Sequence, residues 1–405
     1  MSFVSIPITA RTRVYGIWLI GVSFVLFQFF LQLSSGVIIG AIMQEEQLSA
    51  LQAGILGSAF YYIYTSMQIP VGILFDRRNT RLLLAANALL CSIGCFFFAH
   101  SHHLFLLIIG RMLIGAGSAF AFIGLSHLLR QHFPLKQFAF IIGLSETLGF
   151  LATMFGMIGM GAFIAQWGWR SIINSAGIVG LCIAFLSWQY IPGTTREITG
   201  LKYTQQLTQI FKNSSAWVNG LFVGLSFTVI TVFGAMWAVP FIQIKLSCSL
   251  KLASTVDSMI FLGAAISCPL FGYLASLFSY RFLMIVSCFS TAGLILVILY
   301  LPFNNIFMLA FFMFLIGVCC GAYMLAYSIA NELAPIDSLS TCTGFTNTLA
   351  MLTAPILQPL LGLLLDKLQE MAPESTLFAY QIALSIVPLS LIIAASLVVL
   401  LPLKR

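Results

Sequence analysis

Apolar residues follow one another in runs of about 20 or more along almost the whole chain, and short polar segments separate the runs. Crossing the hydrocarbon core of a bilayer takes about 20 helical residues, so each run predicts one membrane-spanning α-helix. The pattern predicts twelve spans in two groups of six. Their approximate ranges are 14–43, 51–75, 82–99, 104–129, 138–166 and 171–191 in the first group, and 218–244, 252–278, 282–301, 306–330, 341–365 and 376–402 in the second.

The longest polar stretch lies between the sixth and the seventh predicted span. It predicts an N-terminal six-helix bundle at residues 1–191, a cytoplasmic linker at 192–215 and a C-terminal six-helix bundle at 216–405. Two halves of similar length and the same number of spans indicate a chain built by duplication.

The two halves also repeat weakly at the end of their second helices. Gly72 and Gly272 are 200 residues apart, and Arg81 and Arg281 have the same separation. Internal repeats of this kind are typical of transporters built from two related bundles. We therefore expect the two halves to have related structures.

The composition excludes a soluble protein. Of the 405 residues, 60% are apolar and only 7% are charged, and the mean hydropathy is +1.05, whereas a soluble domain carries about 25% charged residues. A transmembrane β-barrel would show short alternating strands rather than long apolar runs. The net charge of +7 does not indicate a nucleic-acid partner, because the basic residues form no clustered face. The bilayer lipid is the expected surrounding of the chain.

The Lys and Arg residues predict how the chain is oriented. Thirteen of the 18 fall on one predicted side of the membrane, four fall on the other, and Arg111 lies within a span. Because cytoplasmic loops carry an excess of Lys and Arg, this asymmetry predicts that both termini and the linker are cytoplasmic.

A short motif lies between the second and third predicted spans, in the segment GILFDRRNTR at residues 72–81. It is similar to a loop signature of the major facilitator superfamily, approximately G-x-x-x-D-R-x-G-R-R/K. The matching residues are Gly72, Asp76, Arg77 and Arg81. Asn79 replaces a glycine of that signature, which we interpret as a mild change because Asn tolerates positive φ better than most residues.

Other segments extend this resemblance. The run GRMLIGAGSAFAF in the fourth predicted span is similar to the superfamily pattern R-x-x-x-G-x-G, with Arg111, Gly115 and Gly117 in place. The runs FQFFLQLSSGV and AFYYIYTSMQIPVGILFDR in the first two spans resemble one branch of the superfamily. That branch comprises transporters of intracellular gammaproteobacteria, related to phagosomal amino-acid transporters and more distantly to lysosomal dipeptide transporters. Such relatives often carry an acid and an arginine where this chain has Gln28 and Gln32.

The resemblance implies an all-α polytopic membrane protein, with twelve transmembrane helices in two pseudo-symmetric six-helix bundles, in a bacterial inner membrane. It also implies a gate at the cytoplasmic end of the second helix. There Gly72 would let helices pack closely, and Asp76 would face the N-terminus of the eleventh helix, where the helix dipole favours a carboxylate. Arg77 and Arg81 would pair with carboxylates or carbonyls in the same layer. Alternatively, these arginines only fix the topology.

Three ionisable residues fall within spans, namely Arg111, Glu146 and Asp257, where charges are costly and usually paired, hydrated or functional. Arg111 is predicted either to contact an anion or to pair with backbone carbonyls. Glu146 is predicted either to take up a proton or to pair with Arg77 or Arg130 in the gate. Asp257 is a candidate for a gate or a proton entry point, and a carboxylate without a role is the alternative.

By the resemblance, helices 1, 4, 7 and 10 line a central cavity. Gln28 and Gln32 are four residues apart and share a helix face, as do Tyr323 and Tyr327, and Trp237 lies on helix 7. Amides, phenols and one arginine suit a small zwitterion, a peptide or a carboxylate. The alternative for each aromatic residue is packing against lipid or another helix.

Enzyme and nucleotide motifs do not appear in the sequence, so transport is expected to be driven by a gradient or to be facilitative. Uptake of an amino acid or small peptide, with protons as the candidate coupling ion, is the first hypothesis. Export of a metabolite, drug or siderophore is the second, and a transport-inactive membrane receptor is the third. We expect a monomer with a small-molecule substrate and neither a cofactor nor a metal site.

Overall fold

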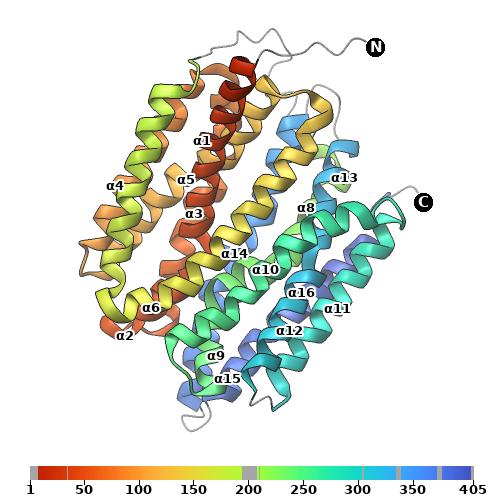
Figure 1. Cartoon of the computed structure of the whole chain (residues 1–405). Helices are drawn as coiled ribbons and strands as arrows, with labels where there is room; N and C mark the ends of the chain where they lie inside the picture. Colours follow the sequence, from red (N-terminus) through yellow and green to blue (C-terminus); the bar gives the residue numbers. More distant parts are fainter. Residues whose placement is uncertain are drawn as a thin grey trace.

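The computed structural model describes residues 8–33, 35–193, 208, 210–302, 305–333, 339–371 and 376–402. The side chains of residues 8–12, 76–77, 135–140, 331, 339–341 and 343 lie outside this description. Every element in the described part of the chain is helical (Figure 1).

The N-terminal half consists of the first six predicted spans. Its helices are α1 (Ile8–Leu33), α2 (Ser35–Glu45), α3 (Ala50–Arg77), α4 (Thr80–Ala99), α5 (Leu104–His132) and α6 (Leu135–Tyr190). Together, α1 and α2 form the first span. The 56 residues of α6 form the fifth and sixth spans, because Gly168 has a non-helical φ of 73° and ψ of 160° that divides the run. A positive φ of this kind favours glycine.

The C-terminal half provides the other six spans, three of which are built from more than one helical segment. Its elements are α8 (Ser214–Ser226), the π-helix η1 (Val229–Trp237), α9 (Ala238–Leu246), α10 (Leu250–Leu274), α11 (Tyr280–Tyr300), α12 (Ile306–Cys319), the 3₁₀-helix η2 (Cys320–Met324), α13 (Leu325–Leu333), α14 (Leu339–Met371), α15 (Thr376–Leu384) and α16 (Ile386–Val398).

The described helices confirm the polytopic all-α fold. Ten segments are long and apolar enough to cross a membrane, and one of them, 141–190, is the run divided at Gly168. Helix α3 is a further span, since its 28 residues rise about 42 Å. Each of the twelve predicted spans therefore corresponds to a helical segment. Most of the predicted linker lies outside the described residues.

Asn79 corrects one detail of the sequence interpretation. Its φ is −64°, so the tolerance of Asn for positive φ has no part in this position. Its side chain instead accepts a hydrogen bond from the backbone N–H of Leu82 and caps the start of α4. Asparagine is one of the preferred N-cap residues, which explains why it can replace glycine here.

The two ends of the helix bundle differ in which helices meet there. We call the side where α3 begins and α14 ends the Asp366 end, and the side where α3 ends and α4 begins the Arg81 end. In Figure 1 the Asp366 end is at the bottom, near the labels α2, α9 and α15. The halves meet mainly through two helix pairs, α3 with α14 and α6 with α10.

Close backbone approach joins the halves toward the Asp366 end. A Cβ on Gly54 would lie 2.8 Å from the Cα of Pro359, and a Cβ on Gly36 would lie 2.7 Å from the carbonyl oxygen of Met236. Small residues let helices approach closely in lipid, where packing rather than hydrophobicity drives association. These glycines therefore allow the contact between the halves.

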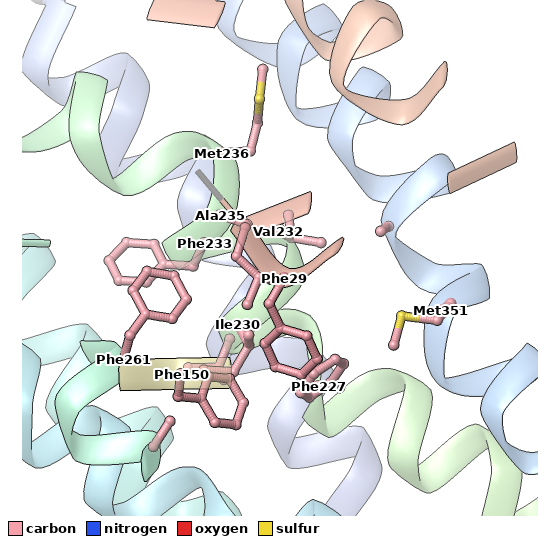
Figure 2. Close-up of a cluster of buried hydrophobic side chains, with 14 of the residues drawn as sticks. Phe29, Phe150, Phe227, Ile230, Val232, Phe233, Ala235, Met236, Phe261 and Met351 are labelled. Atoms are coloured by element: carbon pink, nitrogen blue, oxygen red, sulfur yellow. The ribbon is translucent and has the colours of Figure 1, made fainter. Parts of the chain in front are cut away.

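An apolar core fills part of the region between the halves (Figure 2). The ring centroids of Phe29 and Phe150 are 5.4 Å apart and edge-to-face, and those of Phe150 and Phe261 are 6.5 Å apart and stacked. Phe29 and Phe150 come from the N-terminal half and Phe261 from the C-terminal half, so this core holds the two bundles against each other.

The repeated arginines occupy equivalent positions. Arg81 donates from Nε to the carbonyl oxygen of Ile191 at 2.7 Å, and Arg281 donates from Nη2 to the carbonyl oxygen of Leu401 at 2.9 Å. Each acceptor lies at the end of the last helix of its half, where a cation is favoured by the helix dipole. The weak sequence repeat thus has a matching pair of contacts in the structure.

Candidate functional site

Arg111 on α5 is a buried cation whose donors are only partly used. Its side chain is 3% exposed, and Nη1 donates to the carbonyl oxygen of Leu31 at 3.0 Å. The guanidinium lies 5.3 Å from the centre of the Phe60 ring, within the range of a cation–π contact. Nε and Nη2 have no hydrogen-bond partner among the described residues. Two donors of a buried positive charge are therefore available to another molecule.

Polar side chains from α1 and α3 complete the surroundings of Arg111. Gln28 and Gln32 are buried and hydrogen-bonded to each other, as their shared helix face predicts. Gln32 also donates from Nε2 to the sulfur of Met351 at 3.6 Å, which connects it to the other half. Tyr61 interacts with Gln32 and Arg111, although its buried hydroxyl lacks a hydrogen bond to the described residues. We call Gln28, Gln32, Tyr61 and Arg111 the Arg111 cluster.

Glycines on α5 explain why Arg111 reaches this position. A Cβ on Gly115 would lie 3.1 Å from the backbone carbonyl carbon of Phe60, and a Cβ on Gly117 would lie 2.9 Å from the backbone nitrogen of Cys91. Helix α5 therefore approaches α3 and α4 closely. This approach brings Arg111, one turn before Gly115, beside Phe60 and Tyr61.

Glu146 on α6 faces a different set of side chains. It lies within electrostatic range of Tyr64, Tyr323, Tyr327 and Cys268. We call Glu146, Tyr64, Tyr323 and Tyr327 the Glu146 cluster. It combines residues of both halves, because Tyr64 belongs to α3, whereas Tyr323 and Tyr327 belong to η2 and α13.

A chain of hydrogen bonds supports the Glu146 cluster across the halves. Tyr327 donates from its hydroxyl to Oδ1 of Asn347 at 2.8 Å, and Asn347 donates from Nδ2 to Oε1 of Gln68 at 2.9 Å. Gln68 then donates from Nε2 to the carbonyl oxygen of Tyr64 at 3.2 Å. The amide of Asn347 was not singled out in the sequence, since its partners become visible only when α14 packs on α3.

The described residues show no ion pair between Glu146 and Arg130, and the alternative pairing of Glu146 with Arg77 stays a prediction because the side chain of Arg77 lies outside the description. Arg130 is exposed in the last turn of α5, and the salt bridges among the described residues join Arg170 to Glu45 and Glu46. The described residues give Glu146 neither an ion pair nor a hydrogen bond, so the proton-binding alternative and a ligand-binding role stay open.

The remaining cavity candidates lie in the C-terminal half. Trp237 is fully buried, with its ring centroid 6.5 Å from that of Tyr380 on α15, and its Nε1 has no partner among the described residues. Asp257 on α10 is 0% exposed, and neither carboxylate oxygen has a described hydrogen-bond partner. A buried carboxylate of this kind is costly unless it is neutral or paired.

The gate motif is only partly described. The side chains of Asp76 and Arg77 lie outside the described residues, so the predicted contact of Asp76 with the start of the eleventh helix stays a prediction. Arg81 bonds the carbonyl of Ile191 within its own half. The described residues show no close packing at Gly72, since a Cβ there would meet none of their atoms within 4 Å, and the prediction stays open because nearby side chains of the gate motif lie outside the description.

Comparison with known proteins identifies relatives over most of the chain. Residues 17–356 match the sequence profile of the Major Facilitator Superfamily. An uncharacterized transporter of Bacillus subtilis (strain 168), YybO, is 26% identical over 216 residues, which are 52% of this chain and 50% of that protein. A gallate transporter of Pseudomonas putida is 26% identical over 183 residues, which are 42% of this chain and 38% of that protein. The chain thus spans at most about half the length of these curated relatives.

Among solved structures, a bacterial homolog to the human lysosomal transporter Spinster, in an inward-facing and unoccupied conformation, has the same fold. Its TM-score is 0.73 at 18% sequence identity, and the alignment covers 98% of each chain. At this identity the likeness concerns the arrangement of the helices. It agrees with the two six-helix halves described above.

Proposed function

Because the chain belongs to the Major Facilitator Superfamily, we propose that it is a transporter that moves a small carboxylate-bearing solute across a bacterial inner membrane. The two halves would rock about a site near the middle of the bilayer. Amino acids and small peptides are the first substrate class, since the two clusters combine a cation, an anion, amides and phenols. The gallate transporter among its relatives is named for a substrate that also carries a carboxylate.

The observation that carries this proposal is the state of Arg111. A buried charge is expensive in a membrane unless a partner compensates it, and two of its nitrogens lack one among the described residues. A guanidinium binds a carboxylate through two parallel hydrogen bonds. Substrate binding would thus supply the missing acceptors, and Gln28 and Tyr61 would hold the same ligand from α1 and α3.

We propose Asp257 as the group that takes up the coupling proton. Its two oxygens are buried and have no hydrogen-bond partner among the described residues, and a neutral carboxyl group costs far less to bury than an ionised one. Asp257→Asn should then abolish uptake driven by a pH gradient in proteoliposomes, while exchange of labelled for unlabelled substrate continues. Unchanged gradient-driven uptake in this variant would refute the assignment.

The orientation proposal rests on the distribution of Lys and Arg in the sequence. The Arg81 end would face the cytoplasm and the Asp366 end the periplasm, with the chain acting as a monomer. Impermeant thiol labelling of single cysteines placed at exposed Arg13 and Lys367 tests it in whole cells. Only the cysteine at position 367 should react from outside.

A thermal-shift screen of the purified protein tests the substrate class. Amino acids, dipeptides, hydroxy acids and siderophores are compared, and carboxylates of the first two groups should raise the melting temperature. Arg111→Gln should lose this shift, whereas Arg13→Gln, the same change at an exposed arginine, should keep it. A shift by siderophores alone would favour export instead. A shift that survives in Arg111→Gln would contradict the proposed site.

A further inference from the structure

We propose that the π-helix η1 is a two-state segment, which Ser35 of the other half holds in its π form while the Asp366 end is closed. When the halves separate at that end, η1 would return to the register of an α-helix. The inference concerns how the halves move and not what they carry. It is therefore tested without a substrate, and its failure leaves the proposed substrate class untouched.

The first argument is the length and burial of η1. π-Helices occur mostly as single turns inside α-helices, frequently at functional sites, whereas η1 extends over nine residues. At its end the backbone N–H of Ala238 bonds the carbonyl oxygen of Phe233, five residues earlier. All nine residues are buried, and Figure 2 shows several of them within the apolar core. Each carbonyl group of η1 thus needs a partner from the protein.

The second argument is the proline that follows η1. Pro240 has no N–H, so it cannot bond Ala235, five residues earlier, in a π register or Met236, four residues earlier, in an α register. In either register the helix therefore leaves one carbonyl group without an N–H partner. It is that of Ala235 in the π form and that of Met236 in the α form. A buried carbonyl group in this position costs free energy unless another group donates to it.

The third argument is that the N-terminal half supplies the missing donor. Ser35 on α2 donates from its hydroxyl to the carbonyl oxygen of Ala235 at 3.0 Å, and it shares this proton with the carbonyl oxygen of Gln32 at 2.9 Å. Gly36 lets α2 approach η1, since a Cβ there would lie 2.7 Å from the carbonyl oxygen of Met236. The carbonyl group that the π form leaves without an N–H is thus satisfied from the other half.

A neighbouring hydrogen bond indicates which part of η1 is released when the halves separate. Gln358 on α14 donates from Nε2 to the carbonyl oxygen of Thr231 at 2.8 Å. Both residues belong to the C-terminal half, so this bond persists if that half moves as a unit. The bond from Ser35 to Ala235 crosses between the halves. Separation at the Asp366 end would therefore release the end of η1 and leave its start in place.

Release of Ala235 lets the helix change register. In the α form the N–H of Val239 bonds the carbonyl oxygen of Ala235, and the carbonyl group of Met236 becomes the unpaired one, on the side where water enters between the separated halves. A change of register by one residue turns the following part of a helix by about 100°. Trp237, whose Nε1 has no partner among the described residues, would move with it. Opening of the Asp366 end is thus tied to a rotation of α9.

The test measures two distances in the purified full chain in lipid nanodiscs without a substrate. Spin-labelled unnatural amino acids, which avoid the nine native cysteines, are placed at exposed Gln47 and Lys367 to report the opening of the Asp366 end. A second pair at Leu221 and Gln243 encloses η1. A π-helix has more residues per turn than an α-helix and a smaller rise per residue, so conversion should lengthen the second distance.

Ser35→Ala removes the donor from the buried carbonyl group of Ala235. The population with the longer distance should then rise about tenfold for both label pairs. Ser23→Ala makes the same change at an exposed serine of α1 whose hydroxyl bonds Leu19 within its own helix, and it should leave both distances unchanged. Melting temperatures report whether each variant folds.

Two further controls isolate the role of the proline and of η1. Pro240→Ala gives either register the N–H that the proline lacks, so adding Ser35→Ala in that background should change the populations by less than about twofold. A label pair at exposed Phe282 and Tyr300, on the continuous α-helix α11, should keep a constant distance in every variant.

Three results would overturn the inference. If Ser35→Ala lengthens the distance between Gln47 and Lys367 but not that between Leu221 and Gln243, the serine only joins the halves, and η1 does not change register. If neither distance changes, Ser35 does not hold η1. An equally large shift in the Pro240→Ala background would exclude the proline as the cause. Since no ligand enters these measurements, each of these results leaves the proposed carboxylate site standing.

Discussion

Among the described residues, Arg170 and Asp366 at the Asp366 end bond to other parts of the protein, whereas Arg111 and Asp257 within the spans keep polar atoms without a partner. At that end, Arg170 bonds Glu45 and also bonds Glu46 at 3.0 Å, with only its Nε left without a partner. Farther into the spans, Arg111 leaves two nitrogens unused and Asp257 leaves both oxygens unused. This difference agrees with a structural role for Arg170 and Asp366, and it is the basis for proposing that Arg111 meets a ligand and Asp257 a proton.

Asp366 is the clearest example of a satisfied charge. Its Oδ1 accepts from the backbone N–H of Ala50 and its Oδ2 from that of Leu51, both at 2.9 Å. These bonds connect α14 of one half to the start of α3 in the other. A carboxylate at a helix N-terminus is favoured by the helix dipole, so this contact holds the Asp366 end closed.

The largest effect in this comparison is expected for Asp366→Asn. Loss of a charged hydrogen bond costs about 1.5–3 kcal/mol, which should shift the population toward an open Asp366 end by about tenfold or more. Spin labels on exposed Gln47 and Lys367 should then report longer distances. Glu370→Gln, a change at an exposed acid of the same helix, is the control, and equal distances in both variants would show that Asp366 does not hold this end closed.

A smaller effect on stability is expected to distinguish Arg170 from Arg111. Arg170→Gln removes the pairing with Glu45 and Glu46 and the contact of the guanidinium with the Trp169 ring. Because these groups are partly exposed, each pair contributes about 0–1 kcal/mol to stability. The melting temperature of Arg170→Gln should therefore be a few degrees lower than that of the wild-type protein. Arg111→Gln should leave unliganded stability equal or higher. If Arg111→Gln has a lower melting temperature than Arg170→Gln, Arg111 contributes more to stability than Arg170, and the contrast between the two arginines is wrong.

The smallest effects concern the repeated arginines. Arg81→Gln and Arg281→Gln each remove a cation from the end of a helix, a contribution of about 0.3–1 kcal/mol. The two variants should lose similar free energies of unfolding in parallel denaturation experiments. The two losses should add in the double variant, because the contacts lie in different halves. A loss confined to one variant would show that the two contacts are not equivalent.

The fold could be predicted largely from sequence because a bilayer imposes helix length directly. Long apolar runs gave all twelve spans, and the 200-residue offset of Arg81 and Arg281 indicated that the two halves are related. Local geometry was harder to predict from the sequence. Gly72 matches a packing motif, yet no described atom would lie within 4 Å of a Cβ there, because packing depends on how neighbouring helices lie. Asn79 is a helix cap, which depends on where α4 begins.

The candidate site could be predicted only in part. Arg111, Glu146 and Asp257 stand out as charges in apolar runs, and the four-residue spacing correctly placed Gln28 and Gln32 together. Asn347 and Asp366 could not be recognised, because Asn347 bonds an amide 279 residues away and Asp366 bonds backbone groups that carry no sequence signal. Contacts between the halves arise from packing that the order of residues does not reveal.

The bonds of Asp366 have a consequence for how water enters the protein. The first four N–H groups of an α-helix lack partners within the helix, and in α3 Asp366 accepts from two of them. When the halves separate at this end, both N–H groups lose their acceptors at the same moment, and each needs a water molecule in its place. Opening of this end and hydration of the start of α3 are therefore coupled, so the free energy of hydrating these two N–H groups is part of the free energy of opening.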